Sequence, residues 1–263
     1  MKRYRRTGST PILSKPWLWV VIAVTVLFAL FLLSRTLSQS PPAKPTEKTV
    51  SLNRQDLDTY TRMAGSILFD TTLLLPLNPD RHRLLKQVLK MVGNRELADA
   101  ISRLNRLLRG QPVYEQGLMQ LLIGICYYEL GQPEPALNAF KTGARLLATE
   151  QNPAPGTARL LALHTFNAGY LFQFYSQPDS ARRYYQLCQQ ALALAQPDQR
   201  LTAIILNNLA LTFEAAGDTQ RAQSLYLEAA KLIDTTLNSQ SAERIRKNIH
   251  RLVKQSPAGQ HQS

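Results

Sequence analysis

The chain has 263 residues, of which 44% are hydrophobic, and a formal net charge of +13. The charge is unevenly distributed: residues 1–49 carry +7, residues 50–110 carry +4, residues 111–238 carry −2 and residues 239–263 carry +4. Because the long central part is nearly neutral, we exclude nucleic acid as a partner; contact of the basic ends with anionic lipid headgroups is a simpler explanation, and solvated helix faces are the alternative.

The first predicted element is a transmembrane anchor over residues 17–37, behind a basic tail over residues 1–16. Its core, WLWVVIAVTVLFALFLL, has no charge, and at about 1.5 Å per residue it nearly spans a hydrocarbon layer of roughly 30 Å. A cleaved signal peptide is the main alternative, but the run exceeds the usual core of about 7–15 residues and no A-x-A-like site follows it. A helix buried in a soluble domain is the remaining alternative.

Flanking charge predicts the orientation of this anchor. Five basic residues precede the anchor, and only Arg35 lies close behind its uncharged core, residues 17–33. The positive-inside rule therefore places the N-terminus in the cytoplasm and the rest of the chain on the extracytoplasmic, periplasmic side. We expect a single-pass protein of the bacterial inner membrane, with residues 38–50 as a proline-rich, semi-extended spacer.

Residues 51–112 are predicted to form a leading helix and a degenerate helical hairpin. Apolar residues recur at helical spacing over residues 53–75 and stop at Pro76, which predicts a helix there. Within residues 81–109 we interpret Gly93 as the turn of a hairpin and Ala98 as its packing alanine.

Residues 113–238 repeat one spaced pattern three times. A small residue is followed by an aromatic residue three positions on, an alanine twelve on, an aromatic residue sixteen on and a small residue nineteen on. The three sets are Gly124, Tyr127, Ala136, Phe140 and Gly143; Gly169, Phe172, Ala181, Tyr185 and Cys188; and Ala210, Phe213, Ala222, Tyr226 and Ala229. At helical spacing the small residue lets two helices approach closely, and the aromatic residue fills the space beside their contact. The pattern predicts three pairs of packed helices, with turns at Gly131, Ser176 and Gly217.

This pattern resembles the tetratricopeptide repeat (TPR) family, whose motif combines Gly-x-x-Tyr with Ala-x-x-x-Phe. The resemblance covers roughly residues 115–236. We also predict a capping helix over residues 239–255, because Ile245, Ile249 and Leu252 line one face and basic residues the other, and a disordered tail over residues 256–263. The predicted fold class is all-α: a TPR-like helical-hairpin solenoid with an N-terminal transmembrane helix and a C-terminal capping helix.

In the resembled family, the first helix of each pair lines a concave surface that contacts an extended or helical peptide. On this sequence the positions that the resemblance assigns to partner binding are Leu118, Leu121, Ile125, Tyr128, Phe166, Tyr170, Asn207 and Leu211. If Leu121, Phe166 and Tyr170 face a partner, we expect them to be exposed in the free domain. The alternative is that such side chains pack against a neighbouring helix.

The chemistry of these inner positions predicts the kind of partner. Family members that bind carboxylate tails place lysine, arginine and asparagine there, whereas here only Asn167, Asn207 and Asn208 are similar and basic residues are absent. We therefore expect an apolar or amphipathic partner segment.

Residues suited to catalysis or metal binding are dispersed. Cys126 and Cys188 lie in different repeats without motif-like spacing, and we interpret them as structural, with a disulfide as the alternative. The four histidines form no metal-ligand spacing with them, and no phosphate-binding or nucleophile-elbow motif is present. We therefore expect no enzyme, no cofactor and no metal site.

Together these features predict a membrane-anchored TPR scaffold or assembly factor of an envelope complex, which binds a protein or peptide partner in an apolar concave groove. A chaperone-like holdase for newly translocated chains near the export channel is the alternative, and it should bind many partners where a scaffold binds one. A mitochondrial inner-membrane assembly factor is a third interpretation, since the first 46 residues contain no acid, but the strongly apolar span argues against a cleavable transit peptide.

Overall fold

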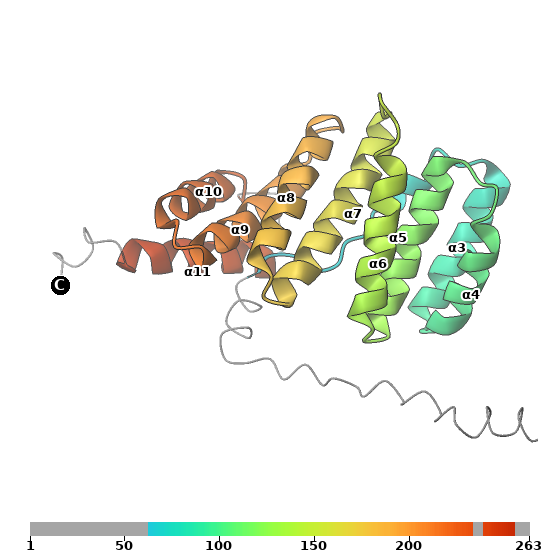
Figure 1. Cartoon of the computed structure of the whole chain (residues 1–263), viewed down its shortest axis with the longest axis horizontal. Helices are drawn as coiled ribbons and strands as arrows, with labels where there is room; N and C mark the ends of the chain where they lie inside the picture. Colours follow the sequence, from blue (N-terminus) through green and yellow to red (C-terminus); the bar gives the residue numbers. More distant parts are fainter. Residues whose placement is uncertain (1–62, 234–238, 256–263) are drawn as a thin grey trace, which may run out of the picture. The chain divides into compact units, whose positions relative to one another are not determined.

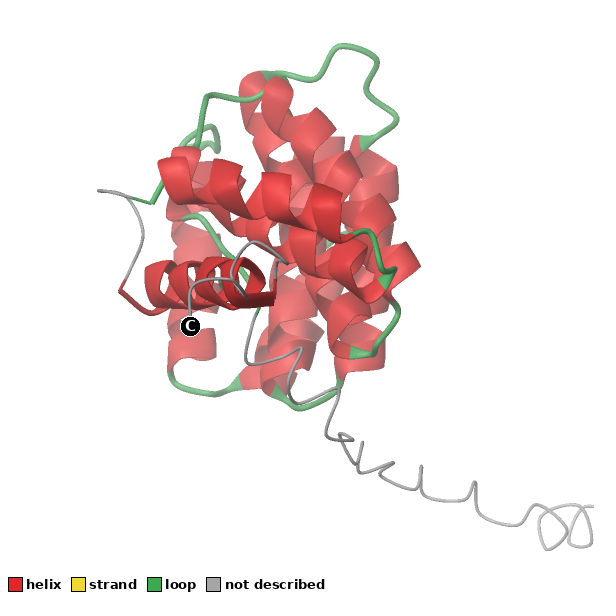
Figure 2. Ribbon diagram, turned by 90° about the vertical axis from the view of Figure 1, so that its left-hand side faces the viewer, coloured by secondary structure: helices red, strands yellow, loops and turns green. Residues whose placement is uncertain are grey.

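The computed structural model describes residues 63–233 and 239–255. Within these ranges the chain forms nine α-helices, one short 3-10 helix and no strand (Figure 2), which confirms the predicted all-α class. Among the helices described, none is both long enough and apolar enough to cross a membrane. The predicted anchor over 17–37, the spacer over 38–50 and the tail over 256–263 lie outside the described residues.

The helices follow one another in four pairs and end with a single helix (Figure 1). Their bounds are η2 Thr71–Leu74, α3 Pro79–Gly93, α4 Leu97–Leu107, α5 Val113–Glu129, α6 Pro133–Leu147, α7 Pro155–Phe174, α8 Pro178–Ala193, α9 Gln199–Ala215, α10 Thr219–Lys231 and α11 Ser239–Gln255. Each α-helix packs against the next along the chain, and the first helices of successive pairs, α5, α7 and α9, also contact one another. One apolar core therefore runs continuously through the pairs.

Local sequence explains where the helices begin. Proline stands in the first turn of α3, α6, α7 and α8, where a missing N–H leaves no helical hydrogen bond unmade. The helices α9 and α10 follow Asp198 and Asp218, whose carboxylates accept hydrogen bonds from the N–H groups of Leu201 at 2.9 Å and Arg221 at 3.2 Å. These caps fix the boundaries of the pairs.

All four pairs turn through one backbone geometry. The residues Arg95, Gly131, Ser176 and Gly217 each adopt a positive φ, between 55° and 79°. In every case the residue after it donates its N–H to the carbonyl five positions earlier, as Gln132 does to Tyr127 at 2.9 Å. The predicted turns at Gly131, Ser176 and Gly217 are thus present, and the first pair turns at Arg95 instead of Gly93, which is the last residue of α3.

The repeated small and aromatic positions lie at the centres of the pairs. A Cβ built on Gly169 would lie 2.9 Å from the ring of Tyr185, which leaves no room for a side chain there. Ala181, Ala222 and Tyr226 are buried in the same way. The spacing seen in the sequence therefore corresponds to close approach of the two helices of each pair.

Two expectations for residues 51–112 are wrong. Residues 63–70 are not helical, and the leading helix is replaced by an extended segment followed by the single 3-10 turn of η2; residues 53–62 lie outside the described ranges. In α4 the side chain of Ala98 is exposed, and Ala100 is the buried alanine, because the apolar face of that helix is set by Leu97, Ile101 and Leu104.

The helix α11 covers the end of the last pair. It packs against α10, with Ile245 fully buried and Ile249 against the core, as predicted; the side chain of Leu252 lies outside the described residues. Its basic residues are not all solvated, however. Arg251 forms an ion pair with Glu214 at 2.6 Å, so this helix is fixed by charge as well as by apolar packing.

Candidate functional site

The candidate site is the side of α5, α7, α9 and α11 that contacts the extended chain before α3. We call residues 63–74 the docked segment and this side of the helices the inner face. The segment passes behind α7 toward α3 (Figure 1), and its contacts follow the helices in reverse order of the chain. Met63 meets α11, Ala64 meets α9, Leu68 meets α7 and Leu73 meets α5.

Two asparagine side chains of the inner face hold the backbone of the docked segment. Asn208 accepts the N–H of Ala64 at 2.8 Å and donates to its carbonyl at 3.0 Å. Asn167 does the same for Leu68, at 2.8 Å and 3.0 Å. Each amide therefore satisfies both backbone polar groups of one residue, which would otherwise be removed from water without partners.

Further hydrogen bonds fix the ends of this segment. Arg244 of α11 donates to the carbonyl of Met63 at 2.7 Å. Tyr114 of α5 donates to the carbonyl of Leu73 at 2.7 Å, and burial raises the pKa of its phenol to about 12, so it remains a donor throughout the physiological range. The inner face thus binds main-chain groups along the whole segment.

A buried polar network orients Asn208. Its Oδ1 accepts from Asn207 at 3.1 Å, and Asn207 in turn accepts from Asn248 of α11 at 2.8 Å. Its Nδ2 also lies 3.4 Å from the hydroxyl of Tyr185, which donates to Gln173 at 2.9 Å. Because each member has a defined partner, the amide of Asn208 is held in the orientation that the docked segment requires.

An ion cluster marks the end of the segment nearest η2. Arg159 of α7 pairs with Asp70 of the segment and with Asp198 before α9, the latter at 2.8 Å. Burial alone would raise the pKa of Asp70, but hydrogen bonds from Thr72 and Arg159 outweigh it and lower the pKa below its usual value. The cluster lies in a cleft of about 910 Å³, the lining of which includes Leu68, Leu163, Gln196, Leu201 and Ile204.

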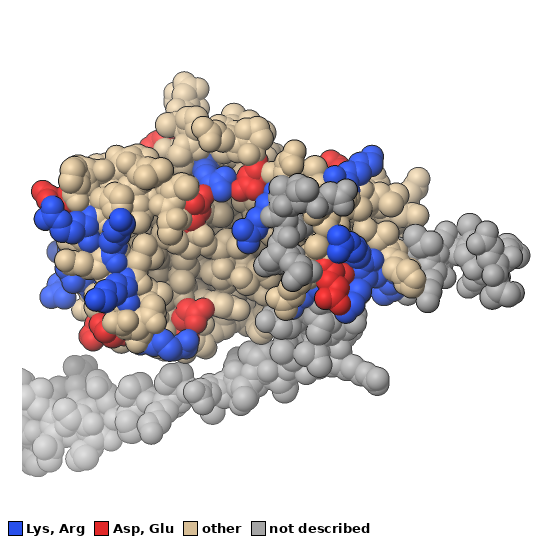
Figure 3. Space-filling model, turned by 180° about the vertical axis from the view of Figure 1, so that it is seen from behind, with Lys and Arg blue, Asp and Glu red and all other residues tan. Residues whose placement is uncertain are grey.

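Charge is unevenly spread over the face shown in Figure 3. Basic side chains gather over α3 and α4 and around α11, whereas the middle carries few. Several of those on α3 and α4 have partners: Arg81 pairs with Glu115 at 3.4 Å, and Arg103 donates to Gln87 at 2.7 Å. These residues belong to helix surfaces outside the inner face.

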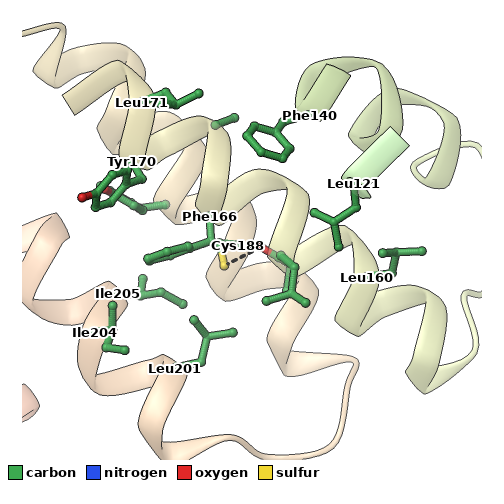
Figure 4. Close-up of a cluster of buried hydrophobic side chains, with 14 of the residues drawn as sticks. Leu121, Phe140, Leu160, Phe166, Tyr170, Leu171, Cys188, Leu201, Ile204 and Ile205 are labelled. Carbon is green, nitrogen blue, oxygen red and sulfur yellow. Dashed lines mark hydrogen bonds between the residues drawn. The ribbon is translucent and has the colours of Figure 1, made fainter. Parts of the chain in front are cut away.

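The partner-binding positions predicted from the sequence are mostly buried in this structure. Exposure is below 5% for Leu118, Leu121, Phe166, Tyr170, Asn207 and Leu211, while Ile125 and Tyr128 are half-buried. The expectation that Leu121, Phe166 and Tyr170 are exposed is therefore wrong. Phe166 still belongs to the inner face, because a Cβ on Gly65 of the docked segment would lie 3.5 Å from its ring. Figure 4 shows it in one apolar cluster with Ile204 and Ile205 of α9.

The predicted partner-binding set did not include four polar residues that hold the docked segment. Asn167 and Asn208 were noted only as asparagines without basic partners, and each is the chain neighbour of a predicted residue, Phe166 or Asn207. Arg159 and Arg244 supply the basic groups, from positions before the repeated motif of α7 and from α11. The prediction missed Asn167 and Asn208 by one position each, and adjacent residues differ by about 100° around a helix.

The two thiols are packed inside the helices and are not paired. Cys126 and Cys188 are both free and buried. Burial raises their pKa, to about 11 for Cys126 and about 12 for Cys188, which disfavours the reactive thiolate. The structural interpretation of both cysteines agrees with this geometry.

Comparison with known proteins gives a structural likeness. No family model matches the chain, and no curated protein matches it. Among solved structures, the crystal structure of BtubC (BKLC) from P. vanneervenii is similar, with a TM-score of 0.58 and 16% sequence identity over 80% of this chain and 86% of that one. At this identity the likeness concerns the fold alone.

Proposed function

We propose that this chain is a TPR-like solenoid that acts as a membrane-anchored scaffold or assembly factor by binding a segment of a partner protein on its inner face. Support for the repeat architecture comes from the shared geometry of the four turns and from the buried small and aromatic positions of the pairs. The role of residues 17–37 as anchor, with the N-terminus in the cytoplasm and the repeats in the periplasm, is proposed from the sequence alone.

The observation that carries the binding function is the paired hydrogen bonding of Ala64 and Leu68 by Asn208 and Asn167. A helical surface that satisfies both backbone groups of an extended chain has the chemistry of a peptide-binding site. Phe166 and Ile204 lie beneath the chain between these two points and supply apolar contact. We therefore place the partner segment on α7 and α9, in an extended conformation.

A photocrosslinking experiment tests this function in living cells. Benzoylphenylalanine at Gln199, an exposed residue that lines the cleft, should crosslink to one dominant partner protein. The same probe at Gln186, exposed on α8, is the matched control and should give no such product. Equal crosslinking from the two positions would show that the inner face is not the binding surface.

The backbone contacts also favour the second candidate, a holdase for newly translocated chains. Hydrogen bonds to main-chain groups are the same for every residue type except proline, so they place little restriction on the partner's sequence. Many different proteins crosslinked at Gln199, with no dominant one, would support the holdase and exclude the scaffold.

The proposed topology has a separate test. Alkaline phosphatase fused after Ser263 should be active, because the repeats are expected in the periplasm. A reporter that works only in the cytoplasm should be inactive at the same position. If it is active there, the repeats lie in the cytoplasm and the proposed orientation is wrong.

A further inference from the structure

We propose that residues 63–70 are an intramolecular ligand of the inner face, which an extended segment of a partner displaces. This inference rests on the proposed function, and it adds what the partner segment must contain. The required pattern begins with a residue that is followed directly by glycine. A second residue, other than proline, stands four positions after that first residue, and a carboxylate stands six positions after the first residue.

The spacing in this pattern comes from the asparagines. Asn208 binds the backbone of Ala64 and Asn167 binds that of Leu68. In each case the N–H and the carbonyl of the same residue are bound, so proline, which lacks the N–H, is excluded from both positions. Any other residue can supply these groups, and a foreign segment could replace this one at the same two points.

The glycine requirement comes from the surface beneath the segment. Gly65 has a φ of +77°, a conformation that residues with a side chain rarely adopt. A Cβ there would also lie 3.0 Å from Cγ2 of Ile204 and 3.5 Å from the ring of Phe166. Both the backbone conformation and the space therefore select glycine at the position after the first bound residue.

The carboxylate requirement comes from Arg159. Its guanidinium is shared between Asp70 of the segment and Asp198 of the inner face. When the segment leaves, Arg159 keeps one acid and loses the other. A carboxylate at the same place on an incoming segment restores the pair.

Displacement is feasible because the helices do not depend on the segment for their own hydrogen bonds. Within the described chain, the backbone groups of Met63, Ala64 and Leu68 bond to side chains of the helices, and no backbone group of residues 63–69 bonds to a backbone group of a helix. From Gly65 to Asp70 the segment is only partly buried, and Ser66 is exposed. Such a segment can open at a lower free energy than the helical core.

Hydrogen exchange of the unmodified full chain, in detergent micelles, tests the first half of the proposal. We expect the amides of Ala64 and Leu68, which donate to Asn208 and Asn167, to be protected and yet to exchange at least tenfold faster than the amides at the centres of α7 and α9. Exchange of the segment only together with those helices would make it an integral part of the core and overturn the proposal.

Binding in trans tests the second half. The probe is a fluorescein-labelled synthetic peptide with the sequence of residues 62–71, and the receptor is the full chain carrying Gly65→Val, which should empty the inner face. By fluorescence anisotropy, we expect the peptide to bind this variant at least tenfold more tightly than the parent chain, in which the attached segment competes at high effective concentration.

Two matched controls define the recognition. The Gly65→Val version of the peptide should not bind, and adding Asn208→Ala to the receptor should remove binding of the parent peptide. Equal affinity for the peptides with and without glycine, or no binding to a Gly65→Val chain that keeps its helical circular dichroism, would contradict the proposal. If that variant does not fold, the exchange measurement on the parent chain decides.

These experiments separate the inference from the proposed function. Peptide binding and early exchange of the segment, with no partner crosslinked at Gln199, would retain the intramolecular ligand and reject the scaffold. A dominant crosslink at Gln199, with a segment that exchanges only with the core, would retain the scaffold and reject displacement.

Discussion

At the scale of single residues, His164 shows how closely the pairs are packed. Its ring lies against Gly143 of α6, where a Cβ would collide with it, and its Nε2 is 2.9 Å from the carbonyl of Gly117 in α5. A carbonyl oxygen can only accept a hydrogen bond, so Nε2 must carry a proton. In the neutral imidazole this is the ring's one N–H group. Burial lowers the pKa of His164 to about 4, against the raising effect of the carbonyls of Gly117 and Phe140.

This buried imidazole predicts a loss of stability in mild acid. Between about pH 6.5 and pH 4 the unfolded chain binds a proton at His164 and the folded chain does not, so the free energy of unfolding should fall by about 3 kcal/mol as the pH is lowered through this window. Urea unfolding at pH 7 and pH 4 measures the loss. His164→Gln keeps a side-chain donor but does not titrate, and its loss should be smaller by that amount. Identical pH profiles for parent and variant would contradict a buried neutral histidine.

Substitution of Phe166 is predicted to lower the stability of the fold. Its ring is fully buried and lies 5.9 Å from the ring of Tyr185, centre to centre. Phe166→Ala should lower the free energy of unfolding by about 3–5 kcal/mol, because it leaves a cavity in the core. Leu194→Ala, at a residue that is 58% exposed, is the control and should change it by less than about 0.5 kcal/mol. If Phe166→Ala changes the free energy of unfolding as little as Leu194→Ala does, the ring of Phe166 is exposed and not buried.

At the scale of the elements, the turns within the pairs depend on one backbone conformation. A glycine adopts positive φ without steric cost, whereas Arg95 and Ser176 adopt it with a side chain. Gly131 has open space around it, since nothing lies within 4 Å of a Cβ built there. The cost of a side chain at Gly131 is therefore purely conformational.

Alanine substitution at two glycines tests this point. Gly131→Ala should lower the free energy of unfolding by about 1–2 kcal/mol, because φ is +71° there. Gly93→Ala is the matched control, since this glycine is helical, with equally open space, and alanine should be neutral or stabilising there by up to about 1 kcal/mol. Equal effects at the two sites, measured by urea unfolding, would exclude the conformational explanation.

At the scale of the whole described molecule, the docked segment links pairs that otherwise contact mainly their neighbours. It contacts α5 through Tyr114, α7 through Asn167 and α9 through Asn208. In stacked repeats each unit contacts mainly the next, so such a crossing segment should make distant units open together. Each of its hydrogen bonds contributes about 0.5–1.5 kcal/mol.

The two buried thiols can measure this coupling. Cys126 in α5 and Cys188 in α8 belong to different pairs, and both are buried, so a thiol reagent reaches them only when the helices open. In the full chain we expect a thiol reagent to give the same free energy of opening for both. With Gly65→Val the two values should separate, and at least one should fall by about 1 kcal/mol or more. Values that already differ in the parent chain would show that the segment does not couple the pairs.

The sequence by itself determined the all-helical class, the three repeated pairs and the turns at Gly131 and Gly217. These features depend on residues within about forty positions of one another, and helical spacing makes close neighbours in sequence close neighbours in space. Only the tertiary structure decided the conformation of residues 63–70 and the contents of the inner face. Apolar residues at helical spacing predicted a helix there, but Asn167 and Asn208, which lie 99 and 144 residues beyond the groups they bind, hold that backbone extended. A backbone conformation that is set by such distant partners leaves no local pattern in the sequence. Phe166, at a position where an open surface was expected, is buried in the core with Gly65 of the segment beside its ring.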